Sequence, residues 1–133
     1  MALKQLSVFL ENREGRLEDL FSVINDNNIA VESFSLAENA EYGVLRLIVS
    51  DAEAAKSALK EKDFSASITD VIGVRLKGGF NDLKNVTDSL PKDLNIEYIY
   101  VLSTNEDSQI IVFNTKKVED AEKVLRENGF DII

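Results

Sequence analysis

The sequence contains no cysteine and no histidine, and these absences remove the most common catalytic and metal-binding side chains. Without cysteine there are no disulfides, thiolate metal sites or cysteine nucleophiles, and the chain needs no oxidising compartment. Acid–base roles can fall only to Asp, Glu, Lys or Tyr, and nucleophilic roles to Ser, Thr, Lys or a carboxylate. No spacing among these residues stands out, so the sequence predicts a protein that is not an enzyme and holds neither a metal nor a cofactor.

Long apolar runs are also missing, and positive charge is scarce. No stretch approaches the length of a membrane span, and the first residues alternate like a strand where a signal peptide would have an apolar run. The 24 acidic and 15 basic residues give a net charge of −9, which repels phosphate backbones and anionic membrane surfaces. The sequence therefore predicts a cytoplasmic protein that binds neither nucleic acid nor a membrane.

The same pattern of residues is present twice along the chain. Three features recur 66 or 67 positions later: Asn28-Ile29 as Asn95-Ile96, Leu17 as Leu83, and Phe64 as Phe130. A unit of this size is marginal as an independent domain, so we expect the two units to be stabilised by packing together. The predicted units are residues 1–70 and 71–133.

Within each repeat, the spacing of apolar residues changes between that of a strand and that of a helix. The first repeat is predicted to have strands at 6–10, 29–36, 42–49 and 64–68 and helices at 17–24 and 54–59. The second is predicted to have strands at 72–76, 96–102, 109–113 and 130–133 and helices at 80–90 and 118–125. The chain from Ser67 to Leu76 is expected to run directly from one repeat into the next.

The order β-α-β-β-α-β, taken twice, predicts an α+β fold with two ferredoxin-like units side by side. They would form one continuous antiparallel sheet of eight strands with helices on one face. Two local signals support the helix boundaries. Ser50 and Glu53 have the spacing of a capping box, and Gly129 is placed to close the last helix in the left-handed conformation.

A short polar loop from Leu10 to Leu17 leads from the first strand into the first helix. Free amides at a helix start can receive the carboxylate of a small zwitterion, and the Asn12 side chain can both donate and accept. The structural alternative is that Asn12 caps the helix and Gly15 permits the turn. Acidic residues suit the positive end of the helix dipole, and a solvated helix start is the expected role of Glu11, Glu14, Glu18 and Asp19.

This loop, the leucine-rich helix after it and the Asn-Ile pair before the next strand closely resemble the ACT domain, the amino-acid-binding regulatory module of amino-acid metabolic enzymes. The family's loop motif typically reads Asn-x-Pro-Gly-x-Leu, or Asn-Arg-Pro-Gly with two more residues. It is matched here by Asn12, Arg13, Gly15 and Leu17. Glu14 stands in place of the usual proline. The resemblance covers nearly the whole chain as two tandem copies, like the small stand-alone tandem ACT proteins of bacteria.

The resemblance implies a ligand at the seam between paired units, held by the loop of one unit and the second strand of the other. The first predicted site comprises Asn12, Arg13, Gly15, Arg16, Leu17, Asn95, Tyr98 and Tyr100. Its pseudo-symmetric twin comprises Gly78, Gly79, Phe80, Asn81, Leu83, Asn28, Val31 and Ser33. The second loop departs from the motif, because glycine and asparagine exchange places in it. The two sites are therefore not expected to be equivalent.

Two functions follow from the resemblance. The first is a non-catalytic regulatory sensor that binds a free amino acid between its units and signals occupancy to an amino-acid metabolic enzyme or to its own oligomer, such as a homodimer. The alternative is a regulatory or docking subunit of an amino-acid biosynthetic enzyme, because the first unit also resembles the small subunit of acetolactate synthase. An RNA-recognition module has the same strand order but needs exposed aromatics on its central strands and a basic surface. The net charge of −9 and the aliphatic residues Leu45, Leu47, Ile111 and Val112 on the central strands argue against that function.

Overall fold

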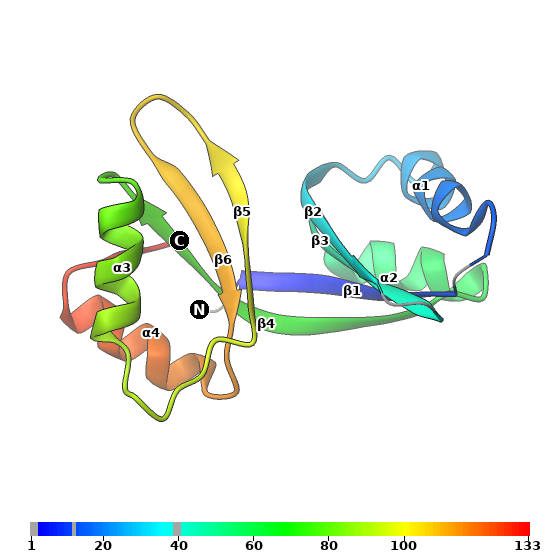
Figure 1. Cartoon of the computed structure of the whole chain (residues 1–133). Helices are drawn as coiled ribbons and strands as arrows, with labels where there is room; N and C mark the ends of the chain where they lie inside the picture. Colours follow the sequence, from blue (N-terminus) through cyan, green and yellow to red (C-terminus); the bar gives the residue numbers. More distant parts are fainter. Residues whose placement is uncertain (1–2, 12, 39–40) are drawn as a thin grey trace. The chain divides into compact units, whose positions relative to one another are not determined.

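The computed structural model describes residues 3–11, 13–38 and 41–133 (Figure 1). The elements in chain order are β1 (Leu3–Glu11), α1 (Arg16–Asp26), β2 (Val31–Glu38), β3 (Tyr42–Val49), α2 (Ala52–Glu61), β4 (Ser65–Leu76), α3 (Phe80–Ser89), β5 (Tyr98–Thr104), β6 (Gln109–Asn114), α4 (Val118–Glu127) and β7 (Asp131–Ile132). The chain divides into two compact units. The N-terminal unit is Lys4–Thr69, and the C-terminal unit is Asp70–Ile133 with Leu3. The predicted order of strands and helices is confirmed in both repeats.

The described residues form seven strands and four helices, so the predicted count of eight strands is wrong. The strands predicted at 64–68 and 72–76 are one strand of 12 residues, β4. The segment between them contains neither proline nor glycine, the residues that most often end a strand. The expectation that the chain runs directly from one repeat into the next is thereby confirmed.

In the N-terminal unit the strands lie in the order β2-β3-β1-β4. β3 pairs antiparallel with both β1 and β2, with Leu47 opposite Leu6 and Leu45 opposite Leu36. Both helices pack against the same face of these strands, because one cluster joins residues of β1, β3, α1 and α2. Its buried members include Leu6, Val8, Leu10, Leu20, Ile24, Leu45, Leu47, Ala55 and Leu59.

The C-terminal unit repeats this arrangement with the order β7-β4-β6-β5. β6 pairs antiparallel with β4 and β5, and the two-residue strand β7 pairs with β4. The helices α3 and α4 again share one face of the strands. Its core includes Ile72, Val74, Leu76, Val86, Leu90, Ile111, Phe113, Ala121 and Leu125. β4 thus contributes Ala66 and Ile68 to the packing of the N-terminal core, and Ile72, Val74 and Leu76 to the C-terminal core.

The start of α2 differs from the predicted capping box. Asp51 is the N-cap, and its carboxylate accepts the Ala54 amide at 3.0 Å. Ser50 does not cap the helix, because its backbone amide donates to the Ala30 carbonyl at 2.9 Å, which directs its hydroxyl to the same neighbour. Aspartate is as good an N-cap as serine, so the helix begins one residue later than the pattern predicts. Gly129 has a φ of 83°, which confirms the left-handed residue expected after α4.

Candidate functional site

The loop between β1 and α1 carries most of the first predicted site. Asn12 lies outside the described residues. Gly15 has φ 79° and ψ −5°, a left-handed conformation that glycine adopts without strain. Arg13 is exposed, and its Nε lies 3.4 Å from the Glu11 carboxylate. Because both of these side chains are largely in solvent, their ion pair adds little stability, and Arg13 remains accessible to a ligand.

Arg16, the first residue of α1, is used to hold the loop in place. Its guanidinium lies over the ring of Phe64, 3.8 Å from the centroid, and its Nη2 donates to the Asp63 carbonyl at 3.2 Å. A cation over an aromatic face is attracted by the ring quadrupole. These contacts tie the β1–α1 loop to the turn between α2 and β4. Leu17, the next predicted residue, packs at the edge of the N-terminal core.

The loop between β4 and α3 carries the predicted twin site and has a different structure. The Asp82 carboxylate accepts the backbone amides of Lys77 and Gly78 at 3.1 and 2.6 Å. Two amides that could receive a ligand carboxylate therefore already hold one from the chain itself. Gly79 has a positive φ of 66°, and Phe80 after it is 80% exposed. Asp82 was not among the predicted site residues, although an acidic residue in the first helical turn is a recognised signal of a helix N-terminus.

The other two residues predicted for the twin site, Asn81 and Leu83, lie in α3 and not in the loop before it. Asn81 is exposed, and Leu83 is partly buried against the C-terminal core. The predicted strand residues lie at the starts of β2 and β5. Asn28 precedes β2 with a positive φ of 56°, Val31 is exposed, and Ser33 is half-buried. Tyr98 and Tyr100 stack on one face of β5 with ring centroids 6.4 Å apart.

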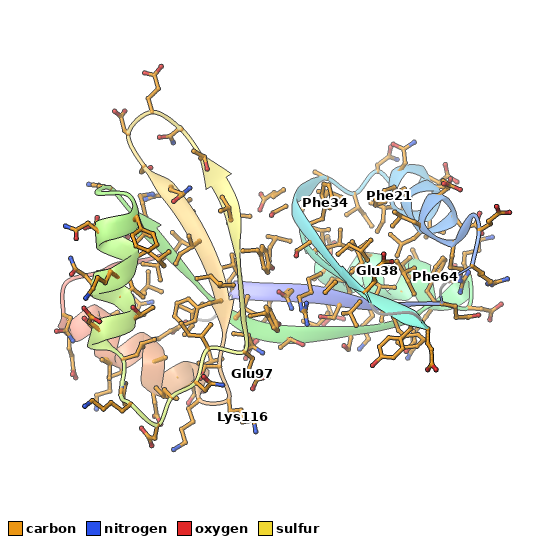
Figure 2. The ribbon with its side chains drawn as sticks, viewed as in Figure 1. Phe21, Phe34, Glu38, Phe64, Glu97 and Lys116 are labelled. Carbon is orange, nitrogen blue, oxygen red and sulfur yellow. The ribbon has the colours of Figure 1, made fainter. Side chains whose placement is uncertain are left out.

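A cavity of about 440 Å³ lies in the C-terminal unit, where the chain enters β5. It is lined by Asp93, Leu94, Asn95, Glu97, Thr115, Lys116 and Lys117. The volume lies within the usual range for small-molecule sites. Asn95 is the one predicted site residue in its wall, and Figure 2 shows Glu97 and Lys116 where β5 begins and β6 ends. The cavity thus combines two carboxylates with two ammonium groups.

Sequence reasoning missed Thr115, Lys116 and Lys117, which follow β6 and precede α4. One signal was available, because lysines beside the N-terminus of a helix oppose its dipole and are unusual there. Among the described residues, no group of three or more acidic side chains is arranged to hold a metal ion. Nor is any helix in the described ranges long and apolar enough to cross a membrane.

Comparisons with known proteins identify the family. The family model of the ACT domain pair matches residues 1–133. The structure resembles that of protein BT0572 from Bacteroides thetaiotaomicron, at 34% identity and a TM-score of 0.88, with 100% of this chain and 92% of that chain covered. None of the curated proteins compared with the chain matches it.

Two further solved structures share the fold. The ligand-free regulatory subunit of aspartate kinase from Thermus thermophilus is 17% identical with a TM-score of 0.65, covering 95% of this chain and 92% of that one. The same subunit from Thermus flavus is 17% identical with a TM-score of 0.59, covering 93% and 90%. Because the family model matches residues 1–133, the chain belongs to the ACT domain pair family.

Proposed function

We propose that the protein is a non-catalytic sensor that binds a free amino acid and signals occupancy to a partner protein or to its own oligomer. Membership of a family of amino-acid-binding regulatory modules supports the ligand class. The observation that carries the proposal is the cavity at the start of β5, which includes the predicted residue Asn95 and offers groups of both charges. An amino-acid zwitterion needs both. Binding would shift the population of conformations by the difference in affinity between them.

The two predicted sites are not equal candidates. Each combines a loop with the start of a strand, and in the twin site both parts are occupied by contacts of the chain itself. Asp82 takes two amides of the β4–α3 loop, and the Ser50 hydroxyl takes the Ala30 amide before β2. We therefore propose that the first predicted site is the better candidate and that one amino acid binds per chain.

The proposed homodimer has a candidate surface on β2, the outer strand of the N-terminal unit. Val31, Phe34 and Leu36 are exposed there, and Phe34 is 62% exposed. Figure 2 shows Phe34 beside Phe21 of α1, with ring centroids 6.4 Å apart. An outer strand with exposed apolar side chains is a template for pairing with another chain. A second copy could therefore pair along β2.

This surface can be tested by light scattering coupled to size-exclusion chromatography. Phe34→Asp should convert a dimer to a monomer. Phe80→Asp is the matched control, because it also places a charge at an exposed phenylalanine, but in the C-terminal unit. If the two variants have the same mass as the unmodified protein, β2 is not the interface.

We also propose unit boundaries at 1–70 and 71–133, helices on one face of one continuous sheet, and a cytoplasmic location. We propose an amino-acid metabolic enzyme as the partner class, because proteins of the same fold include regulatory subunits of aspartate kinase. The alternative function is a regulatory or docking subunit of a biosynthetic enzyme, similar to the small subunit of acetolactate synthase, that stabilises the enzyme without free ligand.

A thermal-shift screen against the twenty common amino acids separates these functions. A ligand that binds only the folded state raises the free energy of unfolding by about 2.7 kcal/mol at one hundred times its Kd. A selective increase in melting temperature with one or two amino acids would support the sensor. No increase with any of them, each in millimolar excess, would contradict the sensor and favour the docking subunit.

A further inference from the structure

The two repeats share a structural corner, where the second strand begins and the third strand ends. In the N-terminal unit Val31 pairs with Val49, and in the C-terminal unit Tyr98 pairs with Asn114. The residue after each third-strand partner is therefore Ser50 in one unit and Thr115 in the other. The helix after each strand begins at a different distance from this hydroxyl, because the N-cap Asp51 directly follows Ser50, whereas the N-cap Lys117 lies two residues after Thr115. The two corners of the fold can nevertheless be compared.

The corner of the N-terminal unit is closed by its own hydrogen bonds. The Ser50 hydroxyl accepts the Ala30 amide at 3.1 Å, and the Ser50 amide donates to the Ala30 carbonyl at 2.9 Å. The next residue, Asp51, caps α2 through the Ala54 amide. The hydroxyl, the helix start and the strand start are thus all satisfied within the chain.

The corner of the C-terminal unit is open. The Glu97 amide, which corresponds to that of Ala30, donates to the Asn114 carbonyl at 2.8 Å and leaves the threonine hydroxyl without that bond. Thr115 is only 3% exposed, and its Oγ1 has no hydrogen-bond partner within the described part of the chain. A buried hydroxyl without a partner is unfavourable, because it has lost its hydrogen bonds to water. The residue lies in the wall of the 440 Å³ cavity.

The start of α4 adjoins the same cavity and also lacks a side-chain cap. Its N-cap is Lys117, which makes no capping hydrogen bond, whereas α2 has an aspartate at the equivalent place. Lys117 Nζ lies 3.9 Å from an Asp93 carboxylate oxygen, and Lys116 forms no ion pair with any described residue. A helix start, an unpaired ammonium group and an unpaired hydroxyl together favour a bound carboxylate.

We infer that this cavity binds the zwitterionic part of a free amino acid, with its carboxylate at Thr115, Lys116 and the α4 start. The ammonium group then faces Glu97 and Asp93, the two carboxylates of the same wall. This inference rests on the proposed sensor function and adds the groups that recognise the ligand. Thr115 and Lys116 are ligand-binding residues that the loop motif does not contain.

Two variants and one control test the assignment by isothermal titration calorimetry with the amino acid that gives the largest thermal shift. Thr115→Val keeps the side-chain shape and removes the hydroxyl, and Lys116→Gln removes the charge. Each should raise the Kd at least tenfold, because a hydrogen bond or ion pair to a carboxylate is lost. Thr115→Val should not lower the melting temperature of the free protein, because its hydroxyl has no partner to lose.

Ser50→Ala is the matched control at the equivalent corner. It should lower the melting temperature, because the Ala30 amide loses its acceptor, and should leave the Kd unchanged. If the unmodified protein binds an amino acid and both cavity variants bind it equally well, the assignment of the cavity is overturned while the sensor function stands. If the unmodified protein binds none of the twenty amino acids, both the function and the assignment fail.

Discussion

Asp82 gives the sharpest stability prediction, because one carboxylate holds the whole β4–α3 loop. Its oxygen accepts two backbone amides, at 3.1 and 2.6 Å, and the side chain is half-buried in the first turn of α3. A fully buried hydrogen bond to a charged group contributes about 1.5–3 kcal/mol, and an exposed capping bond about 1 kcal/mol. For a half-buried carboxylate with two such bonds, Asp82→Ala should lower the free energy of unfolding by about 1–2 kcal/mol.

The assay is thermal or urea unfolding followed by circular dichroism. For a chain of this length, 1 kcal/mol corresponds to ~4 °C in melting temperature, so the variant should melt ~4–8 °C lower. Asp82→Asn keeps an acceptor oxygen but loses the charge that suits the helix start. Its melting temperature should therefore lie between those of the unmodified protein and Asp82→Ala. The order of stability should therefore be aspartate, asparagine and alanine.

Asp88→Ala is the matched control, because it removes a carboxylate from the same helix. The Asp88 carboxylate pairs with Lys84 at 2.7 Å on the surface of α3, an exposed contact that contributes about 0.3–0.5 kcal/mol. Equal effects of Asp82→Ala and Asp88→Ala would refute the reasoning. So would an Asp82→Ala variant as stable as the unmodified protein, since the two amide bonds would then contribute nothing in solution.

Two further predictions concern the β1–α1 loop. Arg16→Ala should lower the free energy of unfolding by about 1–2 kcal/mol in urea titrations, because the contact with the Phe64 ring and a hydrogen bond to the Asp63 carbonyl are lost. Arg13→Ala is the control and should change this free energy by less than about 0.5 kcal/mol, because Arg13 makes only an exposed ion pair. Equal effects of the two variants would show that the ring contact does not stabilise the loop. Asn12→Ala should weaken amino-acid binding by about 1–3 kcal/mol in calorimetry with little change in melting temperature, and an unchanged affinity would remove Asn12 from the site.

The fold could be predicted from the sequence because its elements are written in local periodicity. The alternation of Leu6, Val8 and Leu10 and the helical stripe from Leu17 to Ile24 need no knowledge of distant contacts. The predicted number of strands is wrong because the repeat boundary at 69–70 does not interrupt β4. The residues there do not end a strand, so the ladder continues through them.

The candidate site was less predictable, because its features depend on register across the sheet. Ser50 and Thr115 are both small hydroxyl residues after a strand, and nothing local shows that one is bonded and the other is not. The difference arises because the Ala30 amide donates to the Ser50 hydroxyl, whereas the Glu97 amide donates to the Asn114 carbonyl. Similarly, the motif identified the β1–α1 loop but not Asp82, whose role appears only when the loop folds back on the helix start.

The shared strand β4 also limits which insertions and deletions the protein can tolerate. Ala66 and Ile68 pack against the N-terminal core, and Ile72 and Val74 belong to the C-terminal core, all on even-numbered positions. A single alternation therefore sets the phase of both hydrophobic cores, and one inserted or deleted residue would turn every later side chain of the strand to the opposite face. An insertion or deletion of two residues, by contrast, would preserve the alternation.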